Sequence, residues 1–477
     1  MKKFMQGIPM DIQTKSKLTF LHRVEQMDPK ELSKRPEVRS FWEKGLGWTL
    51  AHRRAFKCFR GSSLPKDPFF EQLIETEPLP LSEVELALLC WGGAGTNGLI
   101  RNDRAFAQNA CTHPWFEGRV YSSACNVWYV HLIFATDEGV FLYRPHVPTR
   151  MVEIKTKKDI EVVFRAFKEG VLKLSDEPLW RAETALAERT RRVKTVKTSF
   201  GTEKLFQPGV TYFFPLVDIT VELINIYLML YSTGTELVDD ETGASAGVQE
   251  WVEKGSLGAK RVPLSLYETG VFQTLIAHPY YIHQNLQLCA AAMGLGGYVT
   301  GGGYDSLMIL HESLQEGGHG FRFEKDRRGY SYPVGIDGLI EAHMPPYLSM
   351  DEAVQDVWDM KFKTNYGRYS PGVREGDEVV YRGYGKQSRA VHRPFKEPEK
   401  YTAAAWIDPE ETVQVARCVA NYIYQTYGRF PKLFNPLLCE NFVQVSHIST
   451  EFYRRYYQED ATWKEQREHL DVWHRKG

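Results

Sequence analysis

The chain has 477 residues, of which 43% are hydrophobic and 25% are charged. This is the composition of an ordinary folded protein, and it argues against wholesale disorder and against a fibrous fold. The 59 basic and 60 acidic residues nearly cancel, so the chain lacks the strong positive charge of a general nucleic-acid binder or a membrane-surface protein. A small-molecule partner is favoured instead.

The cysteines and the apolar segments indicate where the protein works. The seven cysteines are odd in number, widely spaced and without a CxxC pair, which predicts free thiols in a reducing compartment. The N-terminus lacks the apolar stretch of a secretory signal. The most apolar segment, PLVDITVELINIYLML, is interrupted by Asp218 and Glu222 and is shorter than the roughly 20 residues that cross a bilayer. We expect a cytoplasmic protein with no membrane partner, in which this segment is a buried or interface helix.

The first half of the chain shows three recognisable elements. Residues 1–45 are rich in alternating charge and predict a helical arm that packs on the outside. In LPLSEVELALLCWGG, Ser82 and Glu85 form a capping box, which predicts a helix that is stopped by Gly92 and Gly93. The run VWYVHLIFA, its turn and the following VFLYRP are rich in β-branched and aromatic residues and predict a hairpin.

The second half alternates helical and loop-like patterns. Residues 155 to 197 are strongly charged with helical spacing, and we place them in a helical insertion at about 153–205. The segment YIHQNLQLCAAAMGLGGYVTGGG begins as a helix with an apolar stripe from Ile282 to Met293 and ends in glycines. After about residue 345 the chain becomes polar and proline-containing, and then helical, which predicts a C-terminal extension over 346–477.

Two polar segments have residue types that suit a phosphorylated planar ligand. In HRRAFKCFR, the cations Arg53, Lys57 and Arg60 share one face if the segment is helical, and with Arg54 they suit a phosphate. In isolation, a solvated basic helix face explains them better. In RVYSSACNVW, short polar side chains stand just before the strongest predicted strand, where they suit the carbonyl and nitrogen edge of a ring. A capped loop explains this segment at least as well.

The glycine run Gly301, Gly302 and Gly303 removes three successive side chains, so the backbone there can lie against a flat ligand or simply form a turn.

Several other motifs are missing from the sequence. Gly294-Leu295-Gly296 follows a helix and does not complete a dinucleotide-binding fingerprint, and neither a P-loop nor a GxSxG elbow occurs. His311-Glu312 lacks the second histidine of a zinc helix, and the 14 histidines show no metal-ligand spacing, so we expect no metal.

Taken in chain order, these segments resemble the nitroreductase superfamily, and especially its branch of azoline dehydrogenases. RRAFK is similar to the family's RRSxR-like string, with Ala55 in place of the usual serine. LSEVELALLCWGGAG is similar to an LSxxELxxLLWAAxG helix, and RVYSSACNVWYVHLIFATDEGVFLYRP resembles the serine loop, strand and hairpin. QNL followed by AAAMGLG matches the helix that runs into the glycine loop, and PVGIDGL resembles the closing segment.

The resemblance implies an α+β fold with an antiparallel-rich central sheet flanked by helices. Residues 46–345 would be the FMN domain, interrupted by the insertion, with the arm before it and the extension after it. The family is homodimeric with the flavin at the subunit interface. We place that interface at the VELINIYLML helix and at the stripe from Ile282 to Met293.

The resemblance also implies FMN as cofactor and NAD(P)H as electron donor, with the chemistry at flavin N5 and no catalytic side chain. Trp91 and Tyr304 are assigned to the substrate. The FMN-binding residues that it implies are Arg53, Arg54, Lys57, Arg119, Ser122, Ser123, Asn126, Gln284, Asn285, Gly301, Gly302, Gly303, Arg327 and Arg328.

The expected reaction passes hydride or electrons from NAD(P)H to a small aromatic or heterocyclic acceptor. Two alternatives stay open. One is FMN-dependent dehydrogenation of a peptide or natural-product substrate, with oxygen reoxidising the flavin. The other is a non-catalytic scaffold subunit, which is favoured by Ala55 and by Gly302, where many nitroreductases have an acidic residue.

Overall fold

The structure is a computed structural model, and its described parts are joined around one antiparallel sheet. The described residues are 19–61, 76–100, 117–123, 130–145, 153–176, 207–300, 320–362, 373–375, 378–380, 395–404, 408–458 and 461–474.

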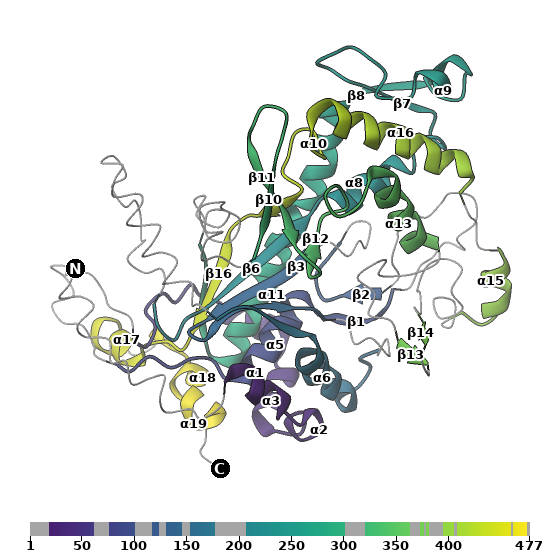
Figure 1. Ribbon diagram of the computed structural model, residues 1–477. Helices are drawn as coiled ribbons and strands as arrows, with labels where there is room; N and C mark the ends of the chain where they lie inside the picture. Colours follow the sequence, from purple (N-terminus) through teal and green to yellow (C-terminus); the bar gives the residue numbers. More distant parts are fainter. Residues whose placement is uncertain are drawn as a thin grey trace, which may run out of the picture.

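Seven antiparallel strands form the central sheet, which runs diagonally through the middle of Figure 1. Six of them follow the order β5-β4-β3-β6-β16-β9, and the seventh, β15, also pairs with β6. The antiparallel sheet and its helices confirm an α+β fold. The strands are β3 (Val130–Thr136), β4 (Gly139–Tyr143), β5 (Val171–Ser175), β6 (Thr211–Asp218), β9 (Gly296–Thr300), β15 (Leu437–Cys439) and β16 (Phe442–Ser446).

Smaller strand groups lie outside this sheet, and all of them except the parallel pair β7–β8 are antiparallel. They are β1 (Thr96–Leu99) with β2 (Glu117–Arg119), β7 (Thr235–Val238) with β8 (Lys260–Pro263), β10 (Arg322–Lys325) with β11 (Ser331–Ile336) and β12 (Ile340–Glu341), and β13 (Val373–Glu375) with β14 (Glu378–Val380).

The helices gather in two groups. Figure 1 shows α1, α3, α5 and α6 below the sheet, and α8, α10, α13 and α16 at its upper end. The first group and its neighbours are α1 (Phe20–Glu25), α2 (Pro29–Leu32), α3 (Pro36–Glu43), α4 (Leu46–His52), α5 (Glu83–Ala94), α6 (Glu161–Gly170) and α11 (Ala277–Met293). The upper group is α8 (Thr220–Tyr227), α10 (Leu264–Leu275), α13 (Met350–Phe362) and α16 (Glu410–Tyr427). The remaining helices are α9 (Gln249–Glu253), α15 (Pro398–Ala404), α17 (Thr450–Tyr456), α18 (Lys464–Arg467) and α19 (His469–Trp473), and the last three lie at the lower left of Figure 1.

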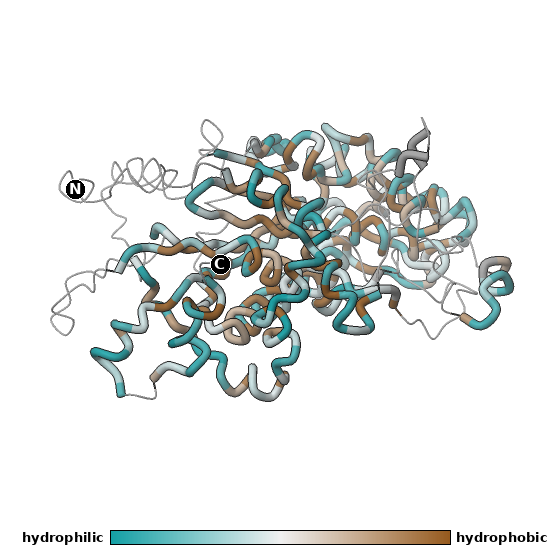
Figure 2. Tube along the Cα trace, turned by 90° about the horizontal axis from the view of Figure 1, so that it is seen from below, coloured by the Kyte–Doolittle hydropathy of each residue, from teal (hydrophilic) through white to brown (hydrophobic). Residues whose placement is uncertain are grey.

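The core is built from the apolar faces of the sheet, which appear as brown segments inside the molecule in Figure 2. The hairpin β3–β4 confirms the prediction for this segment and contributes Phe134 and Phe141, both fully buried. Phe20 of α1 is also buried, with its ring centroid 4.5 Å from that of Phe141. The prediction that the N-terminal arm packs on the outside is therefore wrong for this residue, because an aromatic side chain stabilises the fold most when it enters the core.

Helix α5 confirms the predicted capping box but not the predicted stop. The Ser82 hydroxyl accepts from the Glu85 backbone N–H, and the Glu85 carboxylate accepts from the Ser82 N–H. The helix continues through Gly92 and Gly93 to Ala94. A Cβ at Gly92 would overlap the Sγ of Cys289 on α11, so these glycines allow two helices to approach closely rather than ending one.

Two segments predicted as helical or loop-rich also supply strands. The charged segment contains helix α6 followed by β5, which pairs with β4 at the edge of the sheet. The C-terminal segment supplies β16, which lies between β6 and β9 with all five residues buried. The alternation of apolar and polar residues in FVQVS covers only Val443 to Ser446, and so short a run within a segment predicted as loop-rich and then helical was not recognised as a strand.

The two surfaces expected at the subunit interface are covered within the chain. Helix α8, from the VELINIYLML segment, is almost entirely buried and packs against α10, α13 and α16. The stripe of Ile282, Leu286, Ala290 and Met293 is buried, and α11 packs against α5. Both placements of the interface are wrong, because apolar helix faces at these positions complete the chain's own core.

No disulfide joins the cysteines of the described segments, which agrees with the prediction of thiols for Cys58, Cys90, Cys289, Cys418 and Cys439. In the same segments, none of the helices combines the length and the apolar character that are needed to cross a membrane.

Candidate functional site

The predicted phosphate-binding residues lie in an irregular segment just after α4, which ends at His52, so they do not share a helix face. Arg53 donates from Nη1 to Oε1 of Gln287 on α11, over 3.1 Å. Arg54 and Lys57 are exposed, and the Lys57 ammonium lies 5.2 Å from the ring centroid of Tyr298 on β9. Within the described residues, no carboxylate forms an ion pair with these three cations. Their charges are available to an anion.

Residues 120–123, the serine turn, lie on the other side of α11 from residues 53–57, the basic segment. Ser122 is exposed, whereas the Ser123 hydroxyl is buried and has no hydrogen-bond partner among the described residues. Asn285 of α11 donates from Nδ2 to the Val120 carbonyl over 3.1 Å and so holds the turn in place. A buried hydroxyl without a partner costs on the order of 1–3 kcal/mol, which a polar ligand at this position would recover.

Arg119 is buried at the end of β2, and its guanidinium lies 5.8 Å from the ring centroid of Tyr121. Burial raises the pKa of Tyr121, and the nearby Arg119 charge opposes this shift. The arginine therefore places positive charge next to Tyr121, and its assignment to FMN stays a prediction.

Helix α11 links the two groups of predicted residues but also separates them. Asn285 contacts the serine turn and Gln287 contacts Arg53, and two residues correspond to about 200° around a helix. Between these contacts lies the exposed face of α11, with Tyr280, Tyr281 and Gln284. Within one chain, the basic segment and the serine turn thus flank the same helix without sharing one side of it.

Other predicted residues lie elsewhere or outside the described segments. Asn126, Tyr304 and the glycines 301–303 are not among the described residues. Trp91 donates from Nε1 to the Thr96 carbonyl over 3.0 Å, and its ring centroid is 4.8 Å from that of Trp42. This half-buried indole is engaged in packing between α5 and α3.

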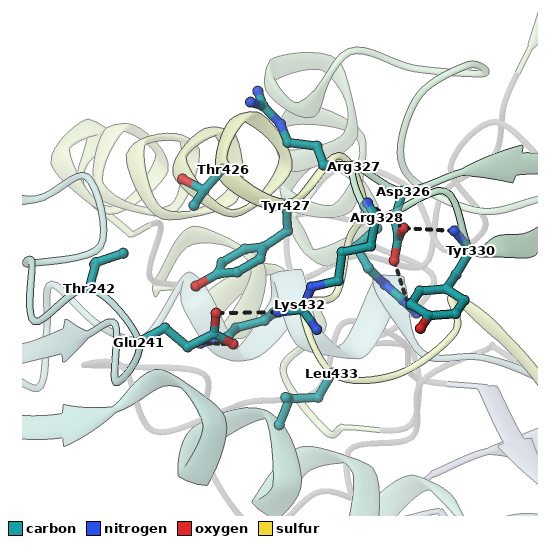
Figure 3. Close-up of a pocket in the computed structure, with 11 residues that line it drawn as sticks. Glu241, Thr242, Asp326, Arg327, Arg328, Tyr330, Thr426, Tyr427, Lys432 and Leu433 are labelled. Atoms are coloured by element: carbon teal, nitrogen blue, oxygen red, sulfur yellow. Dashed lines mark hydrogen bonds and ion pairs between the residues drawn. The ribbon is translucent and has the colours of Figure 1, made fainter.

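Arg327 and Arg328 line a separate pocket of about 430 Å³ that contains none of the other predicted flavin-binding residues (Figure 3). The guanidinium of Arg327 points away from the other labelled side chains in Figure 3. The pocket lies between the β10–β11 turn, the loop after β7 and the end of α16. Its lining residues are Glu241, Thr242, Asp326, Arg327, Arg328, Tyr330, Thr426, Tyr427, Arg429, Lys432 and Leu433.

Acidic groups match most of the positive charge in this pocket. The Lys432 side chain is 2% exposed, and its Nζ lies 2.9 Å from Oδ1 of Asp239. Oδ2 of the same carboxylate accepts a hydrogen bond of 2.6 Å from the Tyr427 hydroxyl. Burial opposes ionisation of Asp239, but the hydrogen bonds from Tyr427 and Lys432 hold its pKa below the usual range. Arg328 and Glu241 also pair, at 3.5 Å. These ion pairs make the pocket a polar structural junction rather than an open anion site.

The expectation that the histidines do not cluster is wrong. Within the described segments, His447, His469 and His474 meet around the carboxylate of Glu85, with their potential ligand atoms within 4.8 Å of one another. Glu85 was identified only as a capping residue. More than 360 residues separate it from His447, and such a separation gives no local pattern in the sequence. The fold alone brings the four residues together.

No family model and no curated protein matches the chain. Among solved structures, a nitroreductase candidate from Ralstonia eutropha JMP134 is similar over 54% of this chain and 70% of its own, at 14% identity and a TM-score of 0.25. A TM-score this low carries no argument about the fold or the activity.

Proposed function

We propose that the chain is an FMN-dependent oxidoreductase whose flavin lies between two copies of the chain. The observation that carries the proposal is the position of α11. Hydrogen bonds tie its Gln287 to the basic segment and its Asn285 to the serine turn, on opposite flanks of one exposed helix face. The segments that resemble the two ends of a flavin site thus meet on one element.

The basic segment fits the phosphate of FMN. Arg53, Arg54 and Lys57 carry three positive charges that no described carboxylate neutralises, and two of the three side chains are exposed. Guanidinium and ammonium groups donate charge-assisted hydrogen bonds to phosphate oxygens. The backbone at Ala55 would replace the serine hydroxyl of the family string as a donor.

The serine turn fits the polar edge of the ring. The Ser123 hydroxyl has an unused hydrogen-bonding capacity, and Ser122 is exposed beside it. Asn126 follows in the sequence and is assigned to the same edge. FMN, when bound, supplies the hydride and electron chemistry, while these residues bind it, orient it and stabilise negative charge on the reduced ring.

A second copy of the chain would bring the two ends together. The exposed face of α11 carries Tyr280 at 48% and Tyr281 at 45% exposure, with Gln284 between the two flanks. The proposed dimer has its twofold axis along the two facing α11 helices, because in this orientation the basic flank of one copy meets the serine flank of the other. This places the interface on the side of α11 opposite to the stripe from Ile282 to Met293.

The first test is FMN binding by the purified full chain. We expect the Arg53→Ala/Lys57→Ala variant to bind FMN on the order of 10²- to 10⁴-fold more weakly, because two charge-assisted contacts of about 1.5–3 kcal/mol each are lost. The control variant Arg39→Ala/Lys158→Ala removes two exposed charges elsewhere and should bind like the wild type. Titration followed by flavin fluorescence measures both constants. Equal affinity in the two variants would overturn the phosphate assignment.

The same preparation decides the direction of the reaction. The FMN-loaded protein is mixed anaerobically with NADH or NADPH, and the flavin absorbance is followed. Bleaching supports transfer from NAD(P)H to a small acceptor, which is the function we propose. A yellow protein that neither donor bleaches would instead be a dehydrogenase, and a chain that binds no FMN would be a scaffold.

A further inference from the structure

The four residues around Glu85 converge from three distant parts of the chain. Glu85 lies in the first turn of α5, His447 directly follows β16, and His469 and His474 belong to α19 and its end. Glu85, His447 and His469 are buried, and His474 is partly exposed. Oε1 of Glu85 lies 2.7 Å from Nε2 of His469, 3.2 Å from that of His447 and 3.4 Å from that of His474.

The hydrogen bonds of the two Nδ1 atoms determine whether the Nε2 atoms of His447 and His469 present a proton or a lone pair to the Glu85 carboxylate. Nδ1 of His447 lies 2.9 Å from the Leu79 carbonyl, and Nδ1 of His469 lies 2.7 Å from the Met293 carbonyl. A carbonyl only accepts, so both Nδ1 atoms carry the proton, and in the neutral ring each Nε2 presents a lone pair. These lone pairs point at Oε1 of Glu85, which also only accepts when ionised.

Such an arrangement needs positive charge at its centre. Protons satisfy it only in part, because Nε2 of His447 and Nε2 of His474 are 3.0 Å apart and cannot both point a proton at the other. A single metal ion satisfies all four atoms at once. Neutral imidazole nitrogens and a carboxylate oxygen are the ligands that zinc takes in proteins.

The distances around Oε1 of Glu85 are close to those of a four-coordinate site, although the four ligand atoms as a group spread over up to 4.8 Å. Tetrahedral zinc, with bonds of about 2.0–2.2 Å, sets its ligand atoms about 3.3–3.5 Å apart. The separations from Oε1 of Glu85 are within a few tenths of an ångström of this range, except the 2.7 Å contact with His469. An ion would move that ring outward slightly.

The surrounding hydrogen bonds are those of a metal site. Ligating histidines in proteins usually donate their other N–H to a carbonyl or carboxylate, as His447 and His469 do here. The second oxygen of Glu85 accepts from the Ser82 N–H at 2.6 Å and from its hydroxyl at 2.7 Å, which orients the first oxygen toward the rings. Ser82, the N-cap of α5, thus orients the Glu85 carboxylate as a metal ligand.

We propose that Glu85, His447, His469 and His474 bind one divalent transition-metal ion, with zinc preferred. Four protein ligands leave no open position, so the ion is structural. It would fasten α19 to α5 and to the strand β16. The proposal does not depend on flavin binding, and the residues concerned are not among those assigned to FMN.

The test uses the full chain purified without chelators. We expect about one zinc ion per chain by elemental analysis, and a melting temperature that falls on chelation and recovers on addition of zinc. Loading with cobalt instead should give the visible absorption bands of a tetrahedral N/O site. The partly exposed ligand allows a mild variant: His474→Gln should weaken zinc binding roughly ten-fold or more and change the cobalt spectrum.

The matched control is His283→Gln, a buried histidine of α11 outside the cluster, which should keep the metal. If His474→Gln fails to fold, the cobalt spectrum and zinc content of the wild type still decide. A wild-type chain without metal, with a melting temperature that zinc does not change and no cobalt bands, would overturn the proposal in favour of a protonated histidine–glutamate network.

Discussion

His343 is a fully buried histidine between two carboxylates. Its Nε2 lies 2.8 Å from Asp356, its Nδ1 lies 3.8 Å from Asp218, and its backbone N–H donates to the Thr220 hydroxyl over 2.9 Å. Burial alone would lower the pKa of His343, but hydrogen bonds and charge from Asp218 and Asp356 outweigh it and raise the pKa to about 9. The ring is therefore charged in the folded protein at neutral pH, and it joins β6, α13 and the loop after β12.

This raised pKa makes stability depend on pH. The unfolded histidine titrates near 6.5, so the stabilisation from His343 is fully present below about pH 6.5 and is lost as the pH rises toward 9. We expect the difference in unfolding free energy between wild type and His343→Gln to shrink by on the order of 3 kcal/mol over that interval. Urea unfolding at a series of pH values measures it.

A control separates this effect from the general response to pH. Gln273 is exposed on α10 and has no titratable group, and the difference between wild type and Gln273→Ala should stay nearly constant over the same interval. If the His343→Gln difference were equally constant, the charged state of His343 would be refuted.

Single residues were predictable from the sequence where their partner is close in the chain. Ser82 and Glu85 are three residues apart, and their capping box was recognised from that spacing. The second role of Glu85 was not, because its histidine partners follow hundreds of residues later. The contact of Arg53 with Gln287 is of the same kind, and it was not predicted, because the family resemblance assigned Gln284 and Asn285 of this helix to FMN and not Gln287.

At the scale of elements, the packing of α5 on α11 depends on two glycines. A Cβ at Gly92 would overlap Sγ of Cys289, and one at Gly93 would lie 3.0 Å from a methyl of Leu286. Both glycines have ordinary helical backbones, so the absence of a side chain, and not an unusual conformation, is what the position requires.

Gly92→Ala should therefore destabilise the fold although alanine favours helices. Alanine gains about 1 kcal/mol over glycine in a helix, but overpacking costs about 1–3 kcal/mol. In the double variant Gly92→Ala/Cys289→Ala the sulfur is gone and the new methyl meets the Cys289 Cβ at 3.5 Å, an ordinary contact. We expect the double variant to regain the lost stability, measured by denaturant unfolding.

The control for this pair is Gly270→Ala in the middle of α10, where the new methyl meets no atom within 4 Å. It should stabilise the protein by up to about 1 kcal/mol. If Gly92→Ala behaved like Gly270→Ala, the close approach of α5 and α11 would be contradicted.

Elements with a strong local pattern were predicted correctly, and those defined by distant partners were not. The hairpin β3–β4 follows from two apolar runs joined by a tight turn, and α11 from its apolar stripe and the terminal Gly294. The strand β16 was missed because its neighbours β6 and β9 lie more than 140 residues away. Apolar periodicity showed that α8 and the stripe on α11 are buried, but not that their own chain covers them.

At the scale of the whole molecule, the C-terminal segment completes the sheet. With β16 between β6 and β9, the segment expected as an extension is part of the central sheet. The surface that remains exposed on α11 is where the proposed function puts a second copy. The sequence indicated an α+β fold through its family resemblance, but a dimer interface depends on which faces the chain leaves uncovered.

The measurement that tests the account most directly is complementation of FMN binding between two inactive variants. Arg53→Ala/Lys57→Ala removes the phosphate end, and Ser122→Trp blocks the ring end at an exposed position. If each site combines the two ends from different copies, a mixed dimer has one intact site, and equal co-expression should restore about one quarter of the wild-type FMN content. Mixed dimers that form, as different affinity tags would show, but bind no FMN would contradict a flavin site shared between two chains.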